Sequence, residues 1–74
     1  MHAFMEDFHV GHIIKQVLDE QGRKTEWFAR QMHYNRTNAY KILEKQHLNS
    51  ETIARASKVL NHDFFLDISQ AMNG

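Results

Sequence analysis

Residues that break helices are almost absent from this chain. It contains no proline, and its glycines are Gly11, Gly22 and Gly74. Proline and glycine oppose helix formation more than any other residues, so their scarcity favours helices over strands. A length of 74 residues leaves room for one small domain with a modest core. We therefore predict an all-α fold, a compact bundle of about five short helices, with an N-terminal arm over residues 1–8 and the domain over residues 9–74.

Polar residues and a glycine mark where each helix is expected to begin and end. Gly22 follows the first periodic segment, where only glycine enters a left-handed helix end without strain. Asn61 is suited to the same conformation after the fourth helix. Short polar side chains that can cap a helix start precede the other apolar segments. The predicted order is a helix at about His9–Gln21, a second capped by Thr25, a break at His33–Asn35, a third capped by Asn35 that runs to about Glu44, a fourth capped by Asn49 or Ser50, and a last one capped by Asp63.

Apolar residues recur along these segments at the three- and four-residue spacing of one helix face. Such a stripe is expected to face the core, and Trp27 is expected to be only partly covered. The predicted core residues are Val10, Ile13, Ile14, Val17, Leu18, Phe28, Ala29, Met32, Ala39, Ile42, Leu43, Ile53, Ala56, Val59 and Leu60, followed by an apolar stripe of Phe64, Phe65, Ile68 and Met72.

The stretch from Thr25 to Leu43 reads as two short helices joined by a tight polar break. This is the arrangement of a helix-turn-helix, which lays its second helix in the major groove of DNA. If the apolar residues of the second helix face inward, Arg36, Thr37 and Asn38 lie on or near its outward face. Arginine can donate two hydrogen bonds to guanine, asparagine can form a pair of hydrogen bonds with adenine, and the methyl group of threonine can contact thymine. In an arbitrary helix, the same residues would simply form a solvated surface.

The net charge of the chain is zero, but the charge is unevenly distributed. Residues 23–47 hold six Lys or Arg against two acidic residues, and the remaining residues carry the compensating acidic excess. Because the local electrostatic potential decides where phosphate binds, we predict that a nucleic acid binds on the side of the molecule formed by the helix-turn-helix stretch. The alternative is an ordinary surface of mixed charge.

The chain resembles the lambda-repressor-like helix-turn-helix domains, which include the Cro and Xre-type regulators of bacteria and phages. The resemblance covers about His9 to Leu66. It is carried by small Ala29, by Met32 and Tyr34 around the turn, by Ala39 and Ile42, and by the stretch SETIARASKVLNHDFF. His33 stands where the family usually has a glycine, because the turn needs a positive φ. Glu44 stands where the family tends to have a neutral or basic phosphate contact.

The resemblance implies a DNA-binding regulator of transcription, with roles for particular residues. Arg36, Thr37 and Lys41 match the main base-reading positions of the family, and Thr25 matches its phosphate-anchoring position. Tyr40 can stack on the sugar-phosphate backbone or pack against the fourth helix, and Lys45 can replace Glu44 as a phosphate contact. The expected base-reading residues are Arg36, Thr37, Asn38 and Lys41, and the expected phosphate contacts are Thr25, Asn35, Tyr40 and Lys45.

The sequence contains no motif that predicts an enzyme, a cofactor or a metal site. It has no cysteine, no glycine-rich phosphate loop and no recognisable nucleophile or acid pair. His9 and His12 have a spacing that a metal can use, and His2 is near them in sequence, but further ligands at a usual spacing are missing. We therefore expect no enzyme activity, no cofactor, no metal and no small-molecule ligand.

Both ends of the chain are apolar, with Phe4, Met5 and Phe8 before the first helix and the Phe64–Met72 stripe in the last. These ends either pack on one another or form a homodimer interface. A dimer would present two recognition helices to neighbouring DNA half-sites. The rival interpretation is a protein-interaction module or antitoxin-type partner that has the same fold and binds DNA weakly or not at all. No segment reaches the length of a membrane span or resembles a secretion signal. The resemblance to bacterial and phage regulators implies a cytoplasmic, nucleoid-associated location and a prokaryotic or phage-like protein.

Overall fold

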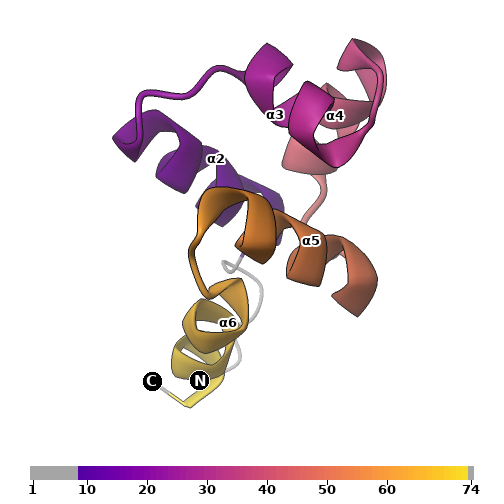
Figure 1. Ribbon diagram of the computed structural model, residues 1–74. Coiled ribbons are helices and arrows are strands. Elements are labelled where there is room, and N and C mark those ends of the chain that lie inside the picture. The colour runs from indigo at the N-terminus through magenta and orange to yellow at the C-terminus, as the bar shows by residue number, and fades with distance from the viewer. Residues whose placement is uncertain (1–8, 74) are drawn as a thin grey trace.

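Residues 9–73 are described by a computed structural model (Figure 1), and they form five α-helices without a strand. The N-terminal arm, including the apolar residues Phe4, Met5 and Phe8 that were expected to pack on the other apolar end or form a dimer interface, lies outside these described residues. The fold is all-α, as the scarcity of helix breakers predicts. The helices are α2 (Val10–Glu20), α3 (Thr25–Met32), α4 (Arg36–Glu44), α5 (Ser50–Leu60) and α6 (Phe64–Asn73).

Side-chain caps hold the starts of several helices, as predicted. The Oδ1 atom of Asn35 accepts the backbone N–H of Asn38 at 2.7 Å, and that of Asn49 accepts the N–H of Thr52 at 2.8 Å. Asp63 Oδ1 accepts the N–H of Leu66 at 3.1 Å. Each bond satisfies a backbone donor that the helix itself leaves unpaired.

The cap predicted at Thr25 is wrong. Lys24 occupies the cap position of α3 with an extended backbone and makes no side-chain cap bond. Thr25 is the first helical residue, and its exposed fraction is only 7%. The threonine side chain is therefore packed into the protein and does not cap the helix.

Left-handed residues end three of the helices. Gly22 has φ +70°, His33 has φ 61° and Asn61 has φ 52°. The value at His33 confirms that the turn needs positive φ, and histidine pays a steric cost there that glycine would not. After His33 the chain turns back, and the Tyr34 N–H donates to Ala29 O at 2.9 Å. This tight turn sets α4 across α3 and completes the helix-turn-helix.

The predicted core is confirmed in most of its positions. The interior is closed by Phe28, Phe64, Ile14, Leu18, Met32 and Leu60, all of which are almost wholly buried. Ile13, Trp27 and Val59 are only partly covered, at the edge of this core. Of the stripe predicted in α6, Phe64 is buried, whereas Phe65 and Met72 are exposed.

The N-terminus of α2 docks directly on the backbone that follows α4. The Val10 N–H donates to Gln46 O and the Gly11 N–H to Lys45 O, both at 3.0 Å. His9 caps the same helix: its Nδ1 accepts the His12 N–H at 3.0 Å, and its Nε2 lies 3.1 Å from Glu44 O. Amides that begin one helix thus meet carbonyls that end another, so both sets of otherwise unpaired backbone groups find partners. This junction fixes the far end of α4 relative to the core.

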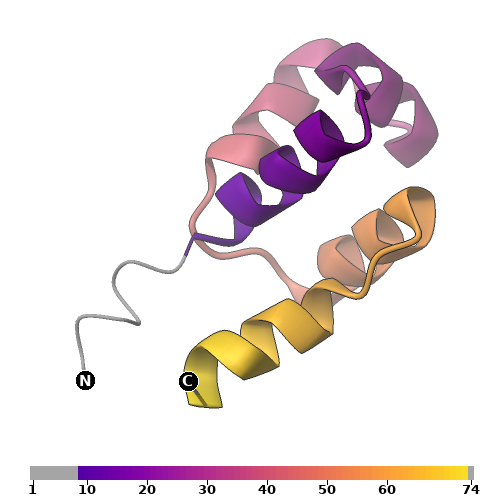
Figure 2. The same ribbon diagram turned by 90° about the vertical axis from the view of Figure 1, so that its left-hand side faces the viewer.

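Helices α3 and α4 form one end of the molecule, and α6 extends from the other (Figures 1 and 2). α4 packs on α2 and α3, while α5 packs on α3 and α6. Arg55 of α5 contacts the turn between α3 and α4. Its Nη2 donates to Met32 O at 2.5 Å, and its guanidinium lies 5.5 Å from the centre of the Tyr34 ring. The helix-turn-helix is therefore held on both sides, by α2 and by α5.

Candidate nucleic-acid interface

The outward face of α4 is formed by the residues that the sequence assigned to base reading. Ala39 is fully buried, and Ile42 and Leu43 are nearly so, which turns the rest of the helix toward solvent. This inward face follows from helical spacing, since residues three and four apart share a side. Arg36, Thr37, Asn38, Tyr40 and Lys41 are all exposed.

Small residues allow α3 and α4 to lie close together. Ala29 of α3 and Ala39 of α4 are both buried, and the two helices pack against one another. A larger side chain at either position would push the helices apart. Glu26 in the first turn of α3 contacts Arg36, the first residue of α4, so both helix starts belong to one surface.

The expected phosphate contacts fall into two groups. Asn35 and Lys45 are exposed at the two ends of α4, and Tyr40 is exposed on its surface. Asn35 also caps α4, so its amide oxygen is already in use. Thr25 is buried at the start of α3, and the exposed side chain at that point is Lys24. Lys24 was missed because the residue before a helix is judged by its capping ability, which lysine lacks.

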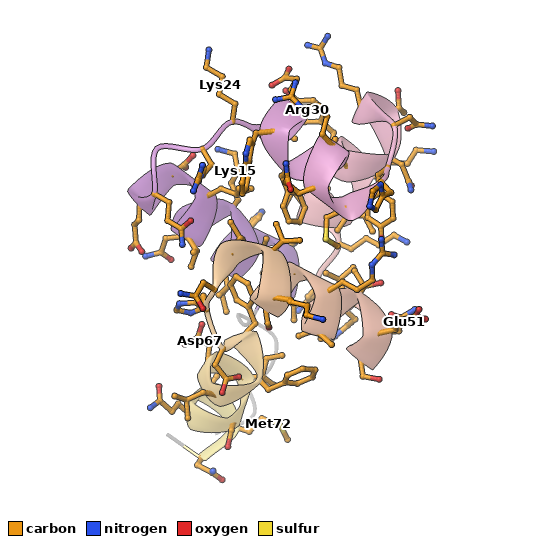
Figure 3. All side chains as sticks on the ribbon, viewed as in Figure 1. Lys15, Lys24, Arg30, Glu51, Asp67 and Met72 are labelled. Atoms are coloured by element: carbon orange, nitrogen blue, oxygen red, sulfur yellow. The ribbon has the colours of Figure 1, made fainter. Side chains whose placement is uncertain are left out.

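A shallow basic hollow lies along α3 and the connection that precedes it. Its volume is about 320 Å³, and it is lined by Gly22, Arg23, Lys24, Glu26, Trp27 and Arg30. The Arg23 guanidinium lies 4.2 Å from the centre of the Trp27 ring, a cation–π contact that covers the tryptophan. Figure 3 shows Lys24 and Arg30 at the end of the molecule formed by α3 and α4. Three of the six cations predicted to form the basic stretch thus line one hollow at α3.

Glu26 adds a carboxylate to the lining of this hollow. Glu26 Oε2 lies 3.3 Å from Arg36 Nε, and the Tyr40 hydroxyl donates to the same oxygen at 3.4 Å. The pKa of Glu26 is lowered from 4.5, mainly by a hydrogen bond to its own backbone amide. Desolvation opposes this as the next largest effect, and the charge of Arg36 and the Tyr40 hydroxyl lower the pKa further by smaller amounts. The carboxylate is therefore ionised at neutral pH. Sequence analysis did not connect it with Arg36, because ten residues and a turn separate the two.

The opposite end of the molecule has a different character. His62 Nε2 lies 2.6 Å from Asp67 Oδ2, where the α5–α6 connection meets α6. Figure 3 shows Asp67 and Met72 on α6, far from Lys24 and Arg30. Phe65, Leu66 and Met72 are among the most exposed large apolar side chains of the described residues. This end is acidic and apolar, whereas the α3–α4 end is basic and polar.

The histidines with metal-compatible spacing have structural partners. The His9 and His12 rings stack with their centres 3.6 Å apart, and both ring nitrogens of His9 face the backbone partners described above. Within residues 9–73, no group of three or more His, Asp or Glu side chains is arranged to hold a metal ion. None of the helices in this part of the chain is long and apolar enough to cross a membrane.

No protein-family model, curated protein or solved structure matches this chain. The resemblance to lambda-repressor-like domains therefore rests on the residues that carry it, and membership of that family remains a prediction.

Proposed function

We propose that this protein is a sequence-specific DNA-binding regulator of transcription in the lambda-repressor-like family. α4 would enter the major groove and read base edges through Arg36, Thr37, Asn38 and Lys41. The observation that carries the proposal is the outward face of α4: all four side chains are exposed on the second helix of a helix-turn-helix, while the apolar residues between them are buried. A recognition helix needs this combination of a fixed inner face and a polar outer one.

The charges beside α4 support the same proposal. Phosphate contacts position a protein on DNA, and base contacts then provide the specificity. Lys45 follows the last residue of α4, Lys24 precedes the first residue of α3, and both are exposed, while Arg23 and Arg30 line the basic hollow with Lys24. A regulator of this kind would act in the cytoplasm of a prokaryote, by occupying its DNA site.

We further propose that two copies associate through α6. Phe65 and Met72 lie seven residues apart on one side of this helix and are 43% and 57% exposed. Apolar side chains gathered at one end of a small protein often mark an interface.

Phe65→Asp should convert a dimer into a monomer in sedimentation experiments without a loss of helix content. A wild-type protein that sediments as a monomer at high concentration would contradict the dimer.

The second candidate function is a protein-interaction module with the same fold. Glu44, exposed at the end of α4, would repel phosphate, and the apolar face of α6 offers a contact for a protein partner. In that case, the partner would bind α6, and α4 would stay free.

The two candidates differ in where a ligand contacts the protein. The test is to follow the backbone amide signals of the isotope-labelled protein by NMR while short mixed-sequence DNA duplexes are added. DNA binding through α4 predicts shifts that are largest in Arg36–Lys41 and at Lys24–Glu26. No shifts at low salt, or shifts confined to α5 and α6, would exclude this mode of binding.

A further inference from the structure

Three side chains on the exposed surface of α3 and α4 form one connected group. Arg36 and Tyr40 lie one turn apart on α4, and both contact Glu26 of α3. The Arg36 guanidinium also lies 5.8 Å from the centre of the Tyr40 ring. The side chain of Arg36 is 72% exposed and that of Glu26 is 45% exposed. Arg36 is therefore accessible to a ligand and is also held from one side.

The atom that Glu26 contacts matters for what Arg36 can do. The ion pair is made at Nε, the guanidinium nitrogen closest to the backbone. Recognition of guanine uses two parallel hydrogen bonds from one guanidinium to O6 and N7. A guanidinium has five N–H donors in a fixed planar fork, so contact at Nε leaves the terminal nitrogens for these two bonds. The pair thus holds the arginine by the donor that guanine does not need.

We propose that Glu26 is a specificity-determining residue, which positions Arg36 for guanine and weakens binding to DNA of other sequence. This inference rests on the proposed DNA-binding function and adds a role that the motif itself does not assign. Glu26 acts through Arg36 and the DNA phosphates, and need not touch a base.

Two effects of the same carboxylate favour the correct sequence. When Arg36 meets guanine, it gains two hydrogen bonds and keeps its contact with Glu26. At a different base this match is absent. If Arg36 then turns to a phosphate, its contact with Glu26 at Nε is lost, and the carboxylate faces the DNA without its cation. A negative charge near phosphate is repelled. Specificity is a difference between affinities, so a group that penalises the wrong complex raises it as effectively as a new contact to the right one.

The test compares Glu26→Gln with Glu51→Gln. Glu51 is also in the first turn of its helix and is exposed, so its substitution removes the same charge away from α4. The wild-type protein first selects sites from a fully randomised duplex library. Affinities are then measured for the selected duplex, for the same duplex with its preferred guanine replaced, and for a mixed-sequence duplex. Thermal unfolding checks that both variants fold.

We expect Glu26→Gln to strengthen binding to the mixed-sequence duplex by about threefold, because a repulsive charge is lost. We expect discrimination at the preferred guanine to fall by about tenfold, because Arg36 is no longer positioned. Glu51→Gln should leave that discrimination unchanged. Without DNA, the NMR signal of the Arg36 Nε–H group should move in Glu26→Gln and remain in place in Glu51→Gln.

Several results would overturn the inference. If Glu26→Gln strengthens binding to all three duplexes equally, Glu26 acts only as a surface charge. If discrimination stays as in the wild type, or the selected site has no guanine preference that depends on Arg36, Glu26 does not position a base-reading residue. A wild-type protein that binds no DNA would overturn the proposed function as well, so the two failures can be distinguished.

Discussion

Gly11→Ala is expected to destabilise the protein strongly, and more than the same substitution at Gly22. A Cβ atom at this position would lie 2.3 Å from the carbonyl oxygen of Leu43 and 2.7 Å from that of Lys45. Both are backbone atoms, which cannot turn aside as the end of a side chain can. The α2 amides would have to move away from the carbonyls that they now contact, and the junction between α2 and α4 would open.

The expected cost is about 3 kcal/mol, at the upper end of the range for overpacked sites. A domain of this length has a total stability of roughly 4 to 11 kcal/mol, so much of it would be lost. Denaturant unfolding followed by circular dichroism measures the change directly.

Gly22→Ala is the matched control for this prediction. A Cβ atom at Gly22 would have no neighbour within 4 Å, but the residue has φ +70°. Its cost is therefore backbone strain alone, about 1 kcal/mol. If Gly11→Ala proves as stable as Gly22→Ala, the packing of α2 against the end of α4 is not as close as described.

The double variant Arg36→Glu, Lys41→Glu is expected to weaken DNA binding by about 100-fold or more. Both cations are exposed on the outer face of α4. A bidentate arginine contact to guanine contributes about 1–3 kcal/mol of discrimination, and each reversed charge adds repulsion of the phosphates. The apolar face of α4 is unchanged, so the fold should persist. Fluorescence anisotropy of a labelled duplex at fixed salt measures the loss.

Lys58→Glu is the control for the effect of charge itself. Lys58 lies in the last turn of α5, as Lys41 does in the last turn of α4, and both are exposed. Reversal at Lys58 should weaken DNA binding only slightly, since it lies outside the α3–α4 surface. Equal weakening by Lys41→Glu and Lys58→Glu would mean that DNA senses only the total charge and that α4 is not the contacting element.

The features that the sequence predicted are those set by neighbouring residues. Asn35 and Asn49 cap their helices because a cap depends on a few adjacent positions. The left-handed ends at His33 and Asn61 follow from local sequence in the same way. The outward face of α4 was also predictable, because apolar spacing determines which side is buried. These local rules were sufficient for the order of the helices and for the exposure of the four candidate reading residues.

The features that were missed depend on residues far apart in the chain. Gly11 was given no role in the predicted first helix, and its need for close packing becomes clear only when the end of α4 lies against it. Thr25 satisfied the local rule for a cap, yet the packing of α3 buried it. The contact of Glu26 with Arg36 requires the crossing of two helices, which periodicity does not specify. Part of the candidate site is therefore a product of tertiary structure.

The most direct test of the central claim is a salt titration of wild-type binding to mixed genomic DNA fragments. Each phosphate that the protein neutralises releases counterions, so the logarithm of affinity falls linearly with the logarithm of salt concentration. Contacts from the cations around α3 and α4 predict a slope of roughly −4. Absence of binding at low salt, or an affinity that does not change with salt, would contradict the claim that this protein is a DNA-binding regulator.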